Sequence, residues 1–145
     1  MGNSQTKVRS GDDYLRDYST EANIPEHISK PASNIILAIC GENYYPCLIM
    51  GSSRCIPNGY FVYFLHNMEE MDIPSSNTIG NFRALLDCDI SFLANGKRFS
   101  GTVRYVASNE NNQPMHFYVC CDKNYTWVTL PNLFLTRVQA NKLLN

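Results

Sequence analysis

The feature that most constrains the fold is the run from Ile90 to Val106, ISFLANGKRFSGTVRYV, in which two alternating apolar stretches flank Asn95-Gly96. Asn-Gly between such stretches is the strongest short-range signal for a β-hairpin, because both turn residues take positive φ at little cost. A second aromatic-rich hairpin of similar build is predicted upstream, within residues 35–65. The chain therefore predicts two small, bent β units in tandem.

Short apolar runs separated by turn residues predict the strands of each unit. In the first unit we expect strands at 35–40, 44–50 and 60–65 and a shorter element at 71–74. In the second we expect strands at 88–93, 99–106, 115–121 and 125–130, followed by 133–135. A terminal helix is predicted over 136–144, with Thr136 as a possible cap and with Val138 and Leu143-Leu144 facing inward.

These elements predict an all-β fold, namely two small SH3-like barrels in tandem with a short C-terminal α-helix. The chain of 145 residues divides into a flexible N-terminal tail at 1–33, a first barrel at 34–84 and a second barrel at 85–145. No apolar stretch is long enough to span a membrane.

The charge balance limits the partners. The net charge is -1 and the pI is about 6.3, so release of counterions from nucleic acid cannot be a large bulk driving force. A weak nucleic-acid contact would need a local patch, for which Lys97, Arg98 and Arg104 are the candidates, and a solvated turn is the alternative.

The cysteines favour a reduced, intracellular protein over a disulfide framework, since they lack C-x-x-C spacing and several fall in apolar runs. No histidine is spaced near them in a finger-like pattern, so we expect no zinc and no other cofactor. The chain also lacks a phosphate loop, a nucleophile elbow and a paired-carboxylate constellation, so we expect no enzyme. The six cysteines are Cys40, Cys47, Cys55, Cys88, Cys120 and Cys121.

The first residues, MGNSQT, satisfy the pattern for N-myristoylation at Gly2. A single acyl chain holds a membrane only marginally without a second signal, and Lys7 and Arg9 form a thin basic patch. Lipidation at Gly2 and a plain flexible tail are thus the two alternatives, and a membrane is not the partner that we expect.

The order of four segments resembles one family. They are AICGENYYPCLI at 38–49, GYFVYFLHNMEEMDI at 59–73, DISFLANGKRFSGTV at 89–103, and the stretch 115–144. Together they are similar to the tandem Tudor module of the p53-binding DNA-damage checkpoint adaptor family. In that family the second barrel carries an F-S-A-G-x-V strand, then a W-Y strand and a helix; here Phe99-Ser100-Gly101-Thr102-Val103, Tyr125-Thr126-Trp127-Val128 and 136–144 stand in that order.

The resemblance implies an aromatic cage for methylated lysine in the first barrel. The faces of aromatic rings attract the methylammonium ion, and a carboxylate accepts a hydrogen bond from any N–H that the ion retains in a lower methylation state. By the resemblance, Tyr45 falls at a cage tyrosine, Phe64 (or Leu65) at the phenylalanine, and Cys40 where the family has tryptophan. The acidic position falls at His66 or Asn67 and the last aromatic at Met68 or Glu69, so the cage is diverged and incomplete.

Three further residue sets have alternative interpretations. Tyr45 and Tyr63 are candidates for the open end of the first barrel, although packing in the core is the alternative for any single ring. The cluster Glu69, Glu70 and Asp72 either supplies a substitute carboxylate or forms a solvated turn. Trp127 is expected to pack in the core or between the barrels.

The sequence thus predicts a non-catalytic, nuclear interaction module that binds a histone tail or another protein's peptide, with altered methyl-lysine specificity. The alternatives are an adaptor that has lost methyl-lysine recognition and a myristoylated, membrane-apposed interaction protein, with the cytoplasm as the alternative location. The predicted site residues are Cys40, Tyr45, Tyr63, Phe64, His66, Asn67 and Glu69.

Overall fold

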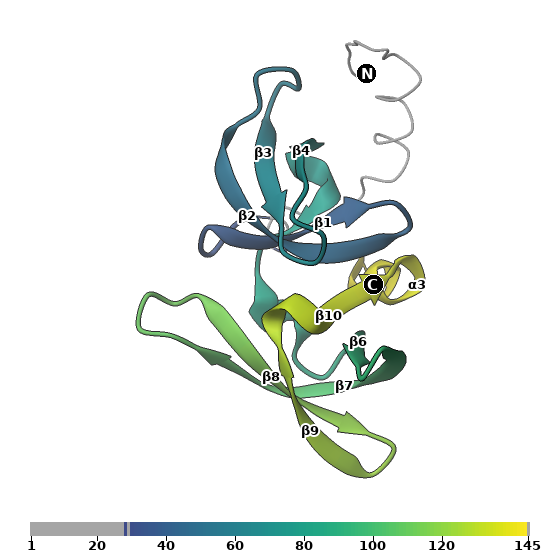
Figure 1. Ribbon diagram of the computed structural model, residues 1–145. Helices are drawn as coiled ribbons and strands as arrows, with labels where there is room; N and C mark the ends of the chain where they lie inside the picture. The colour runs from purple at the N-terminus through teal and green to yellow at the C-terminus, as the bar shows by residue number, and fades with distance from the viewer. Residues whose placement is uncertain (1–27, 29, 145) are drawn as a thin grey trace.

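The computed structural model of the chain describes residue 28 and residues 30–144 (Figure 1). The lipidation site predicted at Gly2 lies outside these residues. Ile28, which the sequence placed in the tail, is buried, and its carbonyl accepts hydrogen bonds from the backbone N–H groups of Gly80 (2.9 Å) and Asn81 (3.1 Å). None of the described helices is long and apolar enough to cross a membrane.

The described chain is all-β with one short C-terminal helix, as predicted. The first barrel contains β1 (Ile35–Cys40), β2 (Asn43–Ser52), β3 (Gly59–Phe64), β4 (Glu70–Pro74), η1 (Ser75–Asn77) and β5 (Thr78–Ile79). After η2 (Phe82–Leu85), the second contains β6 (Asp89–Ala94), β7 (Lys97–Ser108), β8 (Pro114–Cys121) and β9 (Asn124–Thr129). The chain then forms η3 (Leu130–Asn132), β10 (Leu133–Thr136), α3 (Arg137–Asn141) and η4 (Lys142–Leu144).

Antiparallel pairing builds each barrel from neighbouring strands. In the first, β1 pairs with β2 and β5, and β3 pairs with β2 and β4; in the second, β7 pairs with β6 and β8, and β8 pairs with β9. The turn at Asn95-Gly96 has φ of 53° and 76°, and it places Ala94 opposite Lys97. The hairpin signal in the sequence is therefore confirmed.

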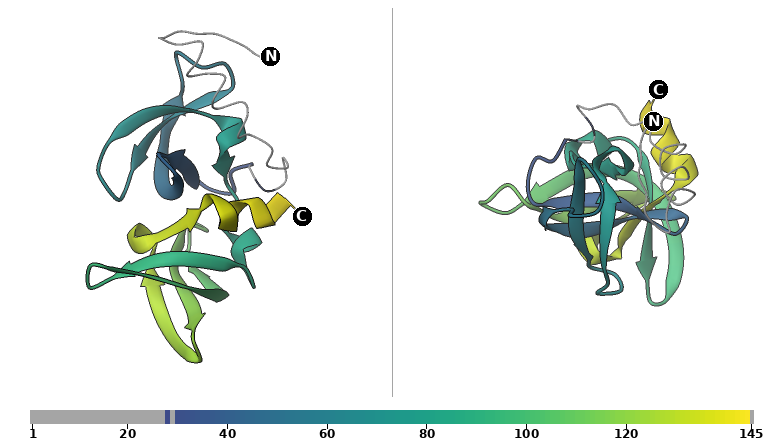
Figure 2. Two further views of the ribbon diagram at one scale, coloured as in Figure 1. Left: turned by 90° about the vertical axis from the view of Figure 1, so that its right-hand side faces the viewer. Right: turned by 90° about the horizontal axis from the view of Figure 1, so that it is seen from above.

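The short strand β10 belongs to both sheets. Its Leu135 pairs with Tyr44 of β2, and its Leu133 pairs with Phe92 of β6. Figures 1 and 2 show β10 lying between the two barrels. The division at residues 84 and 85 therefore assigns to the second barrel a strand that also extends the sheet of the first, and it stays a prediction.

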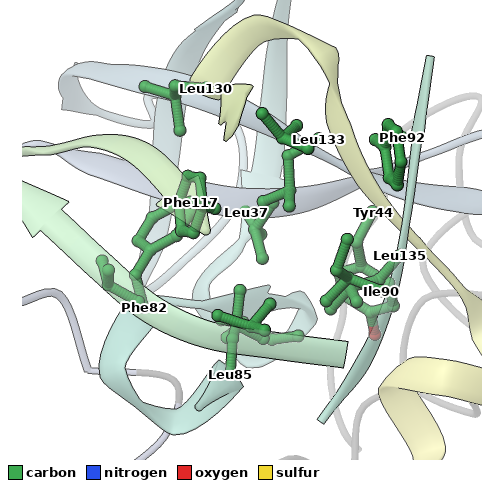
Figure 3. Packing of buried hydrophobic residues seen from close by; sticks show 14 of the residues in the cluster. Leu37, Tyr44, Phe82, Leu85, Ile90, Phe92, Phe117, Leu130, Leu133 and Leu135 are labelled. Atoms are coloured by element: carbon green, nitrogen blue, oxygen red, sulfur yellow. The ribbon is translucent and has the colours of Figure 1, made fainter. Parts of the chain in front are cut away.

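One large apolar cluster is drawn from both barrels. It contains Leu37 of β1 together with Ile90 of β6, Phe117 of β8 and Leu135 of β10. In the view of Figure 3, Leu37 lies among side chains of β8 and β10. The two barrels thus share a core.

A smaller cluster fills the first barrel itself. Strand β1 explains why there are two clusters, because Ile36 and Ala38 face the small one while Leu37 and Ile39 face the large one. Successive side chains of a strand point to opposite faces, so a strand buried on both faces needs a continuous apolar run. The sequence IILAIC of β1 meets that need.

Helix α3 is fixed by a capping box, as the predicted cap at Thr136 indicated. The Gln139 N–H donates to Thr136 Oγ1 (3.2 Å), and the Thr136 N–H donates to Gln139 Oε1 (3.0 Å). The prediction that Val138 faces inward is wrong, since this side chain is 68% exposed. Ala140 is the buried residue of this five-residue helix, and Leu143 packs against the shared core.

The prediction that Trp127 packs in the core or between the barrels is also wrong, because Trp127 is 53% exposed. Its neighbour Val128 is the residue of β9 that faces the core, where it is buried. Since faces alternate along a strand, Trp127 must then point outward.

Candidate functional site

Most of the predicted site residues meet at one end of the first barrel. Cys40 ends β1 and Tyr45 lies near the start of β2, while His66, Asn67 and Glu69 belong to the turn between β3 and β4. We call these five residues the mouth of the first barrel. The structure thus brings together, from two hairpins, side chains that the sequence resemblance had selected one by one.

Backbone hydrogen bonds hold the turn between β3 and β4 in a tight loop. The Phe64 N–H donates to the Glu69 carbonyl (2.9 Å), and the Met68 N–H donates to the Phe64 carbonyl (3.0 Å). The Asn67 side chain accepts from the Glu69 N–H (3.0 Å). Met68, with a φ of 61°, turns outward and is exposed, so it contributes no wall to the mouth. The loop places His66 over the end of the barrel.

The centre of the mouth is a close stack of two rings. The centroids of Tyr45 and His66 lie 3.7 Å apart with an interplanar angle of 12°. Phe64 contacts His66 edge-on at 5.5 Å, but it is fully buried, so it supports the imidazole and offers no surface to a ligand. Partial burial of the ring lowers the pKa of His66, although the residue as a whole is exposed, and nearby Glu69 opposes this shift only in part. The stacked imidazole is therefore neutral at pH 7.

The stack continues toward the second barrel. Phe134 of β10 stacks on Tyr45 at 5.7 Å, and the Arg98 guanidinium lies 4.8 Å from the centroid of the Phe134 ring. Arg98 follows the Asn95-Gly96 turn, so the second hairpin contributes to the surroundings of the mouth. Sequence reasoning missed Phe134; its position between the alternating core residues Leu133 and Leu135 was the available signal.

By the sequence resemblance, Cys40 stands where the checkpoint adaptor family has a cage tryptophan. Burial raises the pKa of its thiol, the carboxylate of Glu69 raises it further, and a hydrogen bond with the Asn67 side chain opposes both effects. Burial also raises the pKa of Cys47 to about 12. Both thiols are therefore protonated at pH 7, and neither is activated as a nucleophile. At no place in the described chain do three or more His, Cys, Asp or Glu side chains form a metal-binding group.

Tyr63 does not belong to the mouth. It pairs with Leu48 of β2, which packs against the large cluster, whereas Tyr45 packs against the small one. Tyr63 therefore lies on the opposite face of the sheet from Tyr45. Glu70 and Asp72, which pair with Tyr63 and with Phe61, share that opposite face, so Glu69 is the acidic residue of the cluster that reaches the mouth.

An open hollow of about 580 Å³ lies on this opposite face, away from the mouth. The hollow lies beside the irregularity in β2 between Ile49 and Gly51, where the register of the pairing with β3 shifts. None of the mouth residues lines it, so it is a separate feature of the first barrel. Its walls include Met50, Arg54, Cys55, Phe61 and Asp72.

Comparisons with known proteins agree with this architecture. No protein-family model matches the chain, and no curated protein matches it. Among solved structures, the chain is similar to the crystal structure of the Crb2 tandem tudor domains, with a TM-score of 0.58 and 15% sequence identity. The match covers 76% of this chain and 88% of that chain. The fold predicted from the sequence is thus confirmed: the chain has the fold of tandem Tudor domains.

Proposed function

We propose that the chain is a non-catalytic peptide-binding module, in the nucleus, whose mouth binds a lysine side chain of a basic peptide such as a histone tail without requiring methylation. The stack of Tyr45 on His66 beside Glu69 is the observation that carries this proposal. The tandem Tudor fold, which the Crb2 structure also has, is that of the checkpoint adaptor family that the sequence resembles. That resemblance supports a peptide such as a histone tail as the ligand.

The condition of the aromatic rings argues against a requirement for methylation. A methylammonium ion is held by open ring faces. Cys40 supplies no ring, Phe64 is fully buried, and His66 covers a face of Tyr45 at 3.7 Å. The mouth therefore lacks the open cage that would favour a methylated lysine over an unmodified one.

The polar groups of the mouth suit an unmodified lysine. An ammonium group has three N–H donors, and each methyl group that is added removes one. The exposed carboxylate of Glu69 is an acceptor with the opposite charge, and the neutral imidazole of His66 does not repel the ligand. Peptide binding thus depends on Glu69 rather than on a cage.

Titration of the chain with one histone-tail peptide, carrying an unmodified, monomethylated, dimethylated or trimethylated lysine, tests the proposal. We expect the unmodified peptide to bind best and the trimethylated peptide, which has no N–H left to donate to Glu69, to bind about tenfold or more weakly. Glu69→Gln should weaken binding of the unmodified peptide by a similar factor, since a charge-assisted hydrogen bond is worth about 1.5–3 kcal/mol. Tyr63→Ala is the matched control and should bind as the wild type does. A marked preference for a methylated state, or no effect of Glu69→Gln, would contradict the proposal.

A reader of methylated lysine is the second candidate, and the exposure of His66 favours it. An exposed turn residue can swing aside and free the face of Tyr45. His66→Ala separates the two candidates: if His66 only closes a latent cage, the variant should gain about threefold to thirtyfold for the dimethylated peptide, the range that one cation–π contact supplies. Unchanged affinity for that peptide would exclude the latent cage.

The lowered pKa of His66 predicts a dependence on pH. The folded state disfavours the imidazolium, so the stability that the neutral His66 ring provides is complete above about pH 6.5, the ordinary pKa of histidine. That stability is lost as the pH falls through the lower pKa of the folded state. Lysine-peptide affinity should fall in the same window, since an imidazolium repels the ammonium. We expect the thermal midpoint and the affinity to decrease between pH 7.5 and 5.5 by a larger amount in wild type than in His66→Gln. Equal decreases in both proteins would show that His66 does not titrate in this way.

A further inference from the structure

Strands β8 and β9 form a hairpin that extends away from the first barrel (Figure 1). Aromatic side chains gather on the outer face of the sheet that these strands form with β7. Tyr105 of β7, Tyr118 of β8 and Trp127 of β9 are paired across the sheet and so form one row on one face. Tyr125 stands in the next row and His116 in the row on the other side. We call these five residues the aromatic face. Tyr105, Tyr125 and Trp127 are 58%, 54% and 53% exposed, respectively.

The rings of the aromatic face hold one another in place. Tyr118 lies 4.8 Å from Trp127 and stacks on Tyr125 at 5.1 Å. Tyr105 and His116 both stand nearly perpendicular to Trp127, at 6.4 Å and 6.3 Å. Such contacts orient the rings before a ligand arrives, which reduces the entropy lost on binding. Trp and Tyr clustered in this way are the residues that most often dominate binding energy at protein interfaces.

Strand β9 adds a source of backbone hydrogen bonds. It ends the order of the sheet and, in the described part of the chain, pairs only with β8. One edge of residues Asn124–Thr129 therefore presents unpaired N–H and C=O groups beside Trp127. An extended peptide can add to such an edge as a further strand, and its alternate side chains then lie over the aromatic face.

The charges around the aromatic face select the chemistry of the partner. The three rows across β7, β8 and β9 contain no Lys, Arg, Asp or Glu in the described structure; besides the aromatic face they hold Thr102, Ala107, Cys120 and Thr129. Phosphate binding draws mainly on Lys and Arg, and the paired residues of these three rows supply neither, which disfavours a nucleic acid as the occupant.

Faces of aromatic rings attract cations, and the guanidinium group is planar and weakly hydrated, so it stacks on them best. Two cations near the aromatic face are already paired, Arg104 with Asp87 at 2.9 Å and Lys142 with Asp89 at 3.6 Å, whereas Lys123 lies in the turn between β8 and β9. Neither of these two is therefore left uncompensated to repel an arriving guanidinium.

We propose that the aromatic face and the edge of β9 form a second binding surface, which takes an extended, arginine-bearing peptide segment of a partner protein. The peptide backbone pairs with β9, and the guanidinium stacks on Trp127 beside Tyr105 and Tyr118. This surface is separate from the mouth of the first barrel, so the two sites are independent.

Panning a random heptapeptide display library on the full chain tests this proposal, with counter-selection on Trp127→Ser. We expect the enriched peptides to share an arginine and to be absent from selections on Trp127→Ser or Tyr105→Ser. The affinity of an enriched peptide is then measured by anisotropy of a fluorescein label. Replacement of its arginine by glutamine should weaken binding by about tenfold or more, and replacement by lysine should weaken it less. N-methylation of alternate peptide amides should abolish binding, because edge pairing needs them.

Two controls make the result specific. Glu69→Gln, at the mouth, should bind the enriched peptide as tightly as the wild type does, and far-UV circular dichroism should show that the Ser variants remain folded. The proposal is overturned if no peptide is enriched, if enriched peptides lack arginine or bind Trp127→Ser equally well, or if N-methylation has no effect. It is likewise overturned if oligo(dT) occupies the surface in its place, or if the chain forms a dimer that dissociates in Trp127→Ser.

Discussion

Leu37→Ala is expected to lower the free energy of unfolding by about 2–5 kcal/mol and to destabilise both barrels at once. Leu37 has no exposed surface and packs in the cluster that β1 shares with β6, β8 and β10. Since a domain of this size has a total stability of about 5–15 kcal/mol, the variant loses a large part of it. Urea unfolding should be followed by far-UV circular dichroism and by the fluorescence of Trp127, the single tryptophan, which lies in the second barrel.

The two signals distinguish a shared core from two separate ones. With a shared core, both transitions shift to lower urea by the same amount, although the substitution lies in the first barrel. Met68→Ala is the control, because its side chain is 73% exposed and should change the stability by less than about 0.5 kcal/mol. If the Trp127 transition stayed in place while the circular dichroism transition split, the two barrels would be unfolding independently.

Gly101→Ala is the second substitution with a large expected effect. A Cβ atom at Gly101 would lie 2.6 Å from the carbonyl oxygen of Cys120 and 2.7 Å from Cγ1 of Val119. The first of these is a backbone atom of β8, which is paired on both sides and cannot move aside freely. We expect a loss of about 1–3 kcal/mol and a decrease of about 2–12 °C in the thermal midpoint measured by differential scanning calorimetry.

Gly51→Ala provides a matched control for that experiment. A Cβ atom there meets nothing within 4 Å, and the backbone of Gly51 is outside the left-handed region. The midpoint should therefore change little in Gly51→Ala. Equal midpoints for the two alanine variants would mean that β7 relaxes away from β8 without cost, and the close approach at Gly101 would then not explain this glycine.

Alternation and turn chemistry were sufficient to predict most of the strands, since both act within a few residues, but the two-residue strand β5 (Thr78–Ile79) was missed. The positive φ at Asn95 and Gly96 and the capping box at Thr136 are confirmed on that basis. Cys40, Tyr45 and His66 could be predicted to lie together only from the resemblance to the adaptor family. No local pattern in the sequence indicates that the β1–β2 hairpin contacts the turn after β3.

Two errors, one at the site and one in the second barrel, came from neglecting alternation. Tyr63 and Phe64 are adjacent in β3, so they cannot both face the mouth, and the structure places Tyr63 on the opposite face. Trp127 and Val128 are adjacent in β9 in the same way, and only Val128 enters the core. In both cases the adjacent residue in the strand held the signal, and for Trp127 the resemblance to the family outweighed it.

The continuous stack of His66, Tyr45, Phe134 and the Arg98 guanidinium could not be predicted, because it depends on pairing between strands that are distant in the sequence. Phe134 reaches Tyr45 only because β10 pairs with β2 as well as with β6. Periodicity shows that Leu133 and Leu135 share a face, yet it does not show which neighbour the strand will have.

The position of β10 in the chain also governs when folding can finish during synthesis. Strand β10 is made after β1–β9, yet it supplies a hydrogen-bonded neighbour to both β2 and β6. Until residue 136 leaves the ribosome, both sheets retain an open edge, and contacts of such long sequence separation form slowly. We therefore expect the first barrel to remain incomplete while the second is being translated, so that both barrels are completed together once β10 is available to pair.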